Sequence, residues 1–223
     1  MDIGSVVKDT FDMYQSFQQA NPLVGTVLTA EFTYLAGDSV AQLMNDKKLN
    51  PRRLLYTAFL APIYALSISA CMQSGELVGK LISPHPFAKS ALGPNLVGNL
   101  HNTFFFVNNA VGEESKYSIP ELFKHYARAF APGKGFGKRF KELYINKFWT
   151  SQYGWAVAGT LTAWNAIQTA NYSVMPEHLR TPTCFVAGFF WGIALNIWAL
   201  RSGRKLATKD AKPVALAPER ILQ

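Results

Sequence analysis

An apolar stretch near the start of the chain carries polar side chains along one helical face. Glu31, Asp38 and Gln42 are spaced seven and four positions apart, so they point within about 20° of one direction on a helix. A carboxylate inside a hydrocarbon core costs at least about 2.5–3.5 kcal/mol, and must therefore face other helices, a partner or water. The spacing predicts either the polar lining of a water-filled path or hydrogen bonds that hold helices together.

Amide side chains repeat this pattern in two later apolar stretches. Asn95, Asn99 and Asn102 share one face of the first, and Gln168 and Asn171 share a face of the second. Amides at such positions form hydrogen bonds between helices or line a cavity. The sequence leaves both interpretations open.

No arrangement of residues points to catalysis or to a metal site. The four histidines lack ligand spacing with cysteine or carboxylate, and neither a Ser/His/Asp set nor a pair of carboxylates stands out. We therefore expect a protein that is not an enzyme and has no cofactor. Cys71 and Cys184 lie in apolar segments, where packing is their expected role and a disulfide the alternative.

A glycine-rich basic run at 132–139 resembles a phosphate-binding loop only superficially, because it lacks the hydroxyl residue after the lysine and the preceding strand. We expect its basic residues to contact anionic lipid headgroups such as those of cardiolipin. These residues are Lys134, Lys138, Arg139 and Lys141.

The polar stripes belong to long apolar segments. The hydrophobic fraction of 49% and the mean hydropathy of +0.04 are close to neutral, but the charged residues cluster and leave apolar stretches between them. Each stretch holds about the 20 residues that cross a hydrocarbon core as a helix. The stretches are 22–44, 54–81, 86–112, 148–172 and 182–200. We predict an all-α integral membrane bundle of four to five transmembrane helices, with a soluble bundle as the alternative.

The distribution of basic residues gives this bundle an orientation. The chain carries 22 Lys and Arg against 14 Asp and Glu. With five crossings, 18 of the basic residues fall on one side, in 45–53, 113–147 and the tail from residue 201. Such asymmetry follows the positive-inside rule, which places this side toward the matrix or cytosol. The basic segments show no aromatic-interleaved motif for nucleic acid, so we expect none to bind.

The two ends of the chain differ in character from its middle. Apolar residues at helical spacing predict that 1–20 is an amphipathic helix at the membrane surface. The bundle then covers 21–203 and includes the basic loop 113–147. The tail 204–223 is polar and contains prolines, and is expected to lack structure of its own.

Two blocks of spaced residues resemble the 22-kDa peroxisomal membrane protein family, also called the Mpv-seventeen family. The blocks cover about 60 residues, and this chain departs from the family pattern at several positions, which suggests a divergent member. The matching residues are Tyr14, Pro22, Thr29, Gly37, Asp38 and Gln42 in the first block, and Trp164, Gln168, Asn171, Pro176, Arg180 and Trp191 in the second.

The resemblance implies a small, non-enzymatic membrane protein with channel-like activity. It implies the mitochondrial inner membrane, with the basic loops and the C-terminus on the matrix side, and the peroxisomal membrane as the alternative. A second reading makes the chain an accessory subunit of a large mitochondrial membrane complex. In that reading the termini contact other membrane-protein subunits.

Overall fold

The computed structural model describes residues 2–130 and 157–210, with side chains for 2–128 and 157–194. The described residues form helices joined by short turns and contain no strand, which confirms the predicted all-α class. The helices are α1 (Ile3–Ala20), α2 (Pro22–Asp46), α3 (Pro51–Leu81), α4 (Pro86–Leu92), α5 (Pro94–Glu114), α6 (Ile119–Phe130), the π-helical turn η2 (Thr160–Trp164), α9 (Asn165–Val174) and α10 (Glu177–Asp210).

Prolines begin four of these helices. Pro22, Pro51, Pro86 and Pro94 are the first residues of α2, α3, α4 and α5. A helix leaves its first N–H groups without internal partners, so proline fits this position. At α3 the Asn50 side chain also accepts hydrogen bonds from the next two helical N–H groups. These starts fix the short turns that join α2 to α3 and α3 to α4.

The stretch 86–112, expected to form one helix, is divided into α4 and α5 at Gly93 and Pro94. Proline has no N–H and its ring clashes with the preceding turn, which ends α4. Gly93 lies against the backbone of Gly75 in α3, and a Cβ at Gly93 would collide with it. The break therefore lets α4 approach α3 closely.

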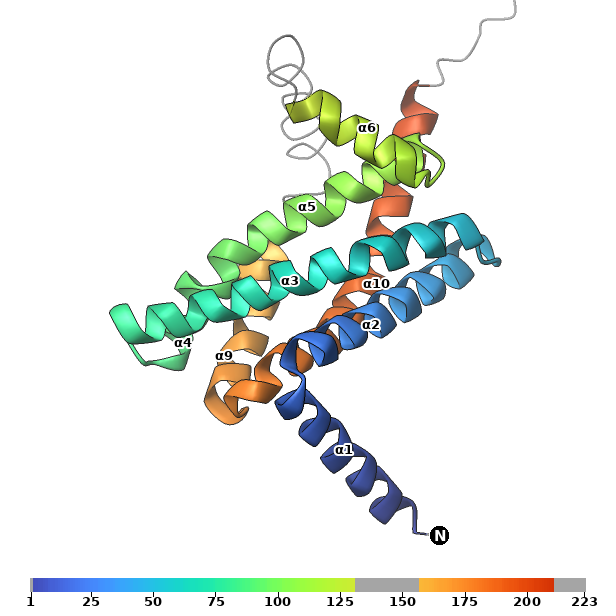
Figure 1. Ribbon diagram of the computed structural model, residues 1–223. Coiled ribbons are helices and arrows are strands. Elements are labelled where there is room, and N and C mark those ends of the chain that lie inside the picture. Colours follow the sequence, from blue (N-terminus) through green and yellow to red (C-terminus); the bar gives the residue numbers. More distant parts are fainter. Residues whose placement is uncertain (1, 131–156, 211–223) are drawn as a thin grey trace, which may run out of the picture.

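The helices pack around α2 and α3 (Figure 1). α10 runs along α2, α2 packs on α3, and α3 packs on α5, while α4 contacts α9. Two apolar clusters fill the interior. The first is largely aromatic and joins α3 to α5 and α6, and includes Tyr56, Tyr64 and Phe105. The second joins α2, α3, α9 and α10, and includes Met72 and Phe185.

Among the described residues, one helix is long and apolar enough to span a membrane. This helix is α3, Pro51–Leu81. The expected crossing 148–172 begins outside the described residues, and 182–200 extends past the last described side chain. α2 and α5 carry the predicted polar stripes, which lower their hydropathy. The number of crossings, four to five, stays a prediction.

Helix α1 extends away from the bundle and contacts it through its C-terminal part (Figure 1). Tyr14 and Gln18 form hydrogen bonds with Thr29 of α2. Farther out, the apolar side chains of Ile3 and Phe11 are 80% and 52% exposed. At the other end of the chain, α10 continues to Asp210, past the predicted boundary at residue 203.

Candidate functional site

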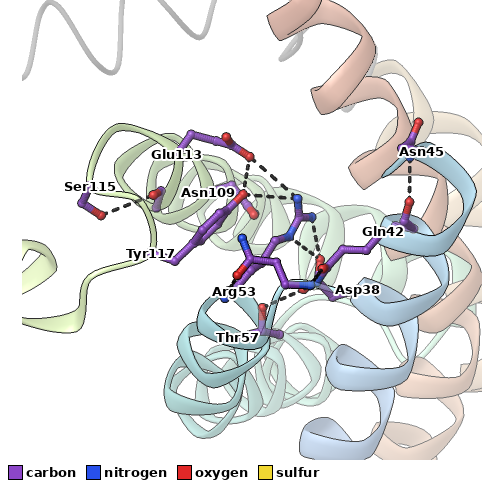
Figure 2. A network of polar contacts seen from close by, with 12 residues as sticks. Asp38, Gln42, Asn45, Arg53, Thr57, Asn109, Glu113, Ser115 and Tyr117 are labelled. Carbon is purple, nitrogen blue, oxygen red and sulfur yellow. Dashed lines mark hydrogen bonds and ion pairs between the residues drawn. The ribbon is translucent and has the colours of Figure 1, made fainter. Parts of the chain in front are cut away.

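A buried ion pair joins the end of α2 to the start of α3 (Figure 2). The Nε and Nη2 atoms of Arg53 lie 2.8 and 2.5 Å from Oδ1 of Asp38. The other carboxylate oxygen accepts hydrogen bonds from Gln42 at 2.8 Å and from Thr57 at 3.2 Å. Asp38 and Arg53 are each 4% exposed. Both oxygens of the Asp38 carboxylate therefore accept hydrogen bonds, and such bonds stabilise a charge in a buried site.

The turn between α5 and α6 completes this cluster. Lys116 and Tyr117 both have positive φ angles, 52° and 61°, which cost conformational energy in residues other than glycine. The turn brings the Tyr117 hydroxyl to Arg53, from which it accepts a hydrogen bond of 3.2 Å, while it donates to Glu113 (Figure 2). Burial raises the pKa of Tyr117 and outweighs the lowering by Arg53. We call Asp38, Gln42, Arg53, Thr57, Glu113 and Tyr117 the Arg53 cluster.

A second ion-pair cluster lies near the opposite end of α3. Glu76 accepts from Arg180 at the start of α10 and from Lys89 of α4, the latter at 3.0 Å. Both cations also lie over the ring of Tyr172, at 5.2 and 5.7 Å from its centroid. The Tyr172 hydroxyl donates to the Met72 carbonyl of α3 at 2.7 Å. We call Glu76, Lys89, Arg180 and Tyr172 the Glu76 cluster.

The two clusters are separated by about the thickness of a bilayer. Between Arg53 and Glu76 the helix carries no charged residue. At 1.5 Å per residue this separation is about 34 Å, against about 30 Å for a hydrocarbon core. Charged groups at both ends with none between is the pattern of a helix that crosses a membrane. Segment 45–53 meets 113–117 at one end of α3, and Lys89 and Arg180 share the carboxylate of Glu76 at the other.

A cavity of about 50 Å³ lies inside the bundle, next to the Glu76 cluster. By volume it has room for about three to four water molecules. Its walls come from α2, α3, α5, η2, α9 and α10 and are mostly apolar. Toward the Arg53 cluster, α3 presents Tyr56, Leu60 and Tyr64, which belong to the aromatic core. The described residues thus separate the cavity from the Arg53 end.

One polar side chain of the cavity, His101, is held on both sides. Ser67 donates its hydroxyl proton to the Tyr64 carbonyl at 2.9 Å, and lies 2.5 Å from Nδ1 of His101. Nδ1 is then the donor to Ser67, and Nε2 accepts from the Tyr34 hydroxyl at 3.2 Å. This assignment follows from the hydrogen-bond network. It gives a neutral histidine whose two ring nitrogens are both satisfied.

The opposite wall is built around the π-helical turn η2. Extra residues in such turns redirect side chains, and they are common at functional sites. Here the turn places Trp164 against Trp191 of α10, with ring centroids 6.2 Å apart and an interplanar angle of 17°. One turn on, Gln168 donates to the Cys184 thiol at 3.1 Å. Cys184 and Cys71 both line the cavity as free thiols.

The structure divides the predicted polar stripes into separate roles. Asp38 and Gln42 belong to the Arg53 cluster, whereas Glu31 is half-buried and forms no hydrogen bond or ion pair with another described residue. Of the amides, only Asn102 and Gln168 line the cavity. Asn102 donates to Thr160 at 3.0 Å.

The remaining amides lie apart from the cavity. Asn99 donates to the Asn95 carbonyl one turn back, and Asn171 donates to Gln168 and to the Arg180 carbonyl. Asn95 is buried, and its Oδ1 has no hydrogen-bond partner among the described residues. The four basic residues proposed for lipid headgroups, at 134–141, lie outside the described residues.

Residues of the two family-like blocks meet one another locally. Tyr14 bonds to Thr29 at 2.8 Å, and a Cβ added at Gly37 would lie 3.8 Å from the ring of Phe189 in α10. Trp164 stacks on Trp191. The remaining matched prolines lie at helix ends, Pro22 at the start of α2 and Pro176 just after α9. These contacts give the motif positions structural roles.

Several residues of the site were not predicted from the sequence. Arg53 and Glu76 stand at the two ends of the charge-free part of α3. A search of the sequence for charged residues that flank an apolar segment could have identified both. Tyr34, His101 and Tyr117 carry no such signal, because their partners come from helices distant in the sequence.

Comparisons with known protein families, with curated proteins and with solved structures find no significant match to this chain. The likeness to the 22-kDa peroxisomal membrane protein family therefore stays a prediction from the two residue blocks. Function has to be argued from the cavity and the two charged clusters.

Proposed function

We propose that this chain is a non-enzymatic, membrane-embedded bundle with channel- or transporter-like activity, of the 22-kDa peroxisomal membrane protein type. The observation that carries the proposal is a cavity inside the bundle, with a partly exposed ion-pair cluster one helical turn beyond one end and packed aromatic residues at the other. A cavity that is blocked at one end by packed side chains suits a solute site that connects to the far side only when that end rearranges. It suits a transporter-like protein better than a permanently open pore.

The charge distribution supports the membrane placement. The Arg53 and Glu76 clusters are spaced for the two surfaces of a bilayer, and the described basic residues of 45–53 and Lys116 belong to the Arg53 end. The positive-inside rule then directs the Arg53 cluster and the C-terminus to the matrix of the mitochondrion. The peroxisomal membrane, with the same end toward the cytosol, is the alternative compartment.

Solute flux through reconstituted vesicles tests the activity. Purified full-length protein should make liposomes permeable to small solutes, measured as swelling in isosmotic solutions of neutral and anionic solutes. Gln168→Leu should change this rate, because Gln168 lines the cavity. Gln19→Leu is the matched control, since Gln19 lies on α1 and pairs with His178 away from the cavity. Folded wild-type protein that leaves the vesicles as tight as empty ones would contradict the activity.

A second candidate function is that of an accessory subunit in a large membrane complex. The observation that favours it is α1, which extends from the bundle with exposed apolar side chains along its length (Figure 1). Such a surface suits another membrane protein as well as the bilayer interface. Native gels in mild detergent distinguish the two, because a subunit migrates with its complex and a free transporter migrates alone.

A further inference from the structure

The surface of the cavity suits an apolar ligand. Its walls are mostly apolar, and His101, Asn102 and Gln168 among them already bond to the protein. His101 is bonded to Ser67 and Tyr34, and Gln168 donates to Cys184. A polar solute would have to break these bonds, or leave its own groups unpaired in an apolar space. An alkyl chain makes neither demand.

The Glu76 cluster places positive charge one helical turn beyond this apolar space. Met72 and Cys184 line the cavity. Glu76 comes one turn after Met72 on α3, and Arg180 comes one turn before Cys184 on α10, about 6 Å along each axis. Lys89 and Arg180 share the single carboxylate of Glu76, so the cluster has one positive charge in excess. The side chains of Lys89 and Arg180 are each 16% exposed, so they can be reached from outside.

Glycines keep the cavity open. Gly98 of α5 and Gly188 and Gly192 of α10 line it, and a Cβ added to any of them would meet no described atom within 4 Å. Close helix packing therefore does not explain these glycines. Each glycine in a helix costs about 1 kcal/mol relative to alanine. Glycine thus lowers helix stability at three positions where a larger side chain would narrow the cavity.

We propose that the cavity binds the first few methylene groups of a long-chain carboxylate, a fatty acid anion, whose carboxylate lies at Lys89 and Arg180. The cavity volume of about 50 Å³ holds this part of the chain. The rest of the chain leaves the cavity between α5 and α10, past Gly98 and Gly188, and the single excess positive charge of the Glu76 cluster matches a monoanion. This assignment rests on the membrane placement proposed above and gives the solute site a substrate class.

Photocrosslinking tests the site directly. Full-length protein in phosphatidylcholine vesicles is irradiated with palmitate that carries a diazirine close to its carboxyl end, and the labelled residues are mapped by mass spectrometry. We expect labels at Met72 and Cys184, which disappear when unlabelled palmitate is added. Labelling confined to outward residues such as Leu96 would overturn the proposal. So would cavity labelling by a diazirine phosphatidylcholine that palmitate does not displace.

Filling the cavity should weaken the label. Gly188→Leu adds four carbon atoms and should lower cavity labelling by at least about tenfold, since one methylene group alone changes binding in an apolar pocket by about that much. The control is Val186→Leu, which adds bulk on the exposed face of the same helix and should change nothing. Gly98→Leu repeats the test from α5, in case α10 tolerates the change poorly. Equal labelling in wild type and in both folded glycine variants would refute the site.

The headgroup has a test of its own. Lys89→Gln leaves Glu76 paired with Arg180 and should weaken palmitate competition by about threefold, because a partly solvated charge contributes modestly. Lys124→Gln, on the exposed surface of α6, is its control. Unaltered competition in Lys89→Gln would contradict the carboxylate position. If the cavity is labelled but the vesicles show no solute flux, the proposed transport is refuted and the fatty acid site stands. If solute flux occurs but the cavity is not labelled, the fatty acid site is refuted and the transport stands.

Discussion

Replacing Arg53 with alanine should be among the most destabilising single changes in the chain. Asp38 is 4% exposed and receives two of its four hydrogen bonds from Arg53. Without the guanidinium, its charge would rest on the neutral donors of Gln42 and Thr57 alone. Removing one partner of a buried ion pair costs about 3–5 kcal/mol, because the other charge stays buried without compensation.

Unfolding of the purified protein in detergent, induced by dodecyl sulfate and followed by tryptophan fluorescence, measures this cost. Lys124→Ala is the matched control, since it removes the cation of an ion pair with Glu121 on the exposed surface of α6. The double variant Asp38→Leu with Arg53→Met should recover much of the loss, because it buries no charge. An Arg53→Ala midpoint equal to that of Lys124→Ala would refute the reasoning.

Three further outcomes follow from the packing. Gly93→Ala should destabilise the bundle by about 1–3 kcal/mol through collision with the backbone of α3, and Gly98→Ala should not, as thermal unfolding of both variants will show. Tyr117→Phe should cost about 1 kcal/mol in the same assay, because the hydroxyl bonded to the Arg53 cluster is lost. Cys71 and Cys184 should resist alkylation by maleimide in folded protein and react after unfolding, which mass spectrometry can follow; rapid reaction of the folded protein would contradict their burial.

Sequence patterns predicted the helical class and many helix ends because these depend on local chemistry. Proline at a helix start acts within one turn, and Pro22 begins both the predicted stretch 22–44 and α2. Asp38 and Gln42 lie on one face of α2, as predicted, because helical geometry alone fixes which residues share a face. Glu31 shares that direction and yet has no described partner, because the face on which a residue lies does not determine what packs against it.

The rest of the site depends on contacts between distant segments. Asp38 meets Arg53 only because a short turn folds α3 back on α2, and His101 meets Tyr34 across 67 positions. The π-helical turn that directs Trp164 into the cavity arises from packing rather than from a local motif. The cavity itself is an absence of side chains, and hydrophobic periodicity carries no information about where glycines will face each other.

Placing α3 across the bilayer is the central claim, and cysteine accessibility tests it most directly. In a background without Cys71 and Cys184, single cysteines replace Arg52 and Lys80, which are exposed near the two ends of α3, and Leu66, which is exposed between them. With the protein in sealed vesicles in one orientation, a membrane-impermeant maleimide should label positions 52 and 80 from opposite sides and leave position 66 unlabelled. Labelling of all three positions from the same side would contradict the membrane placement.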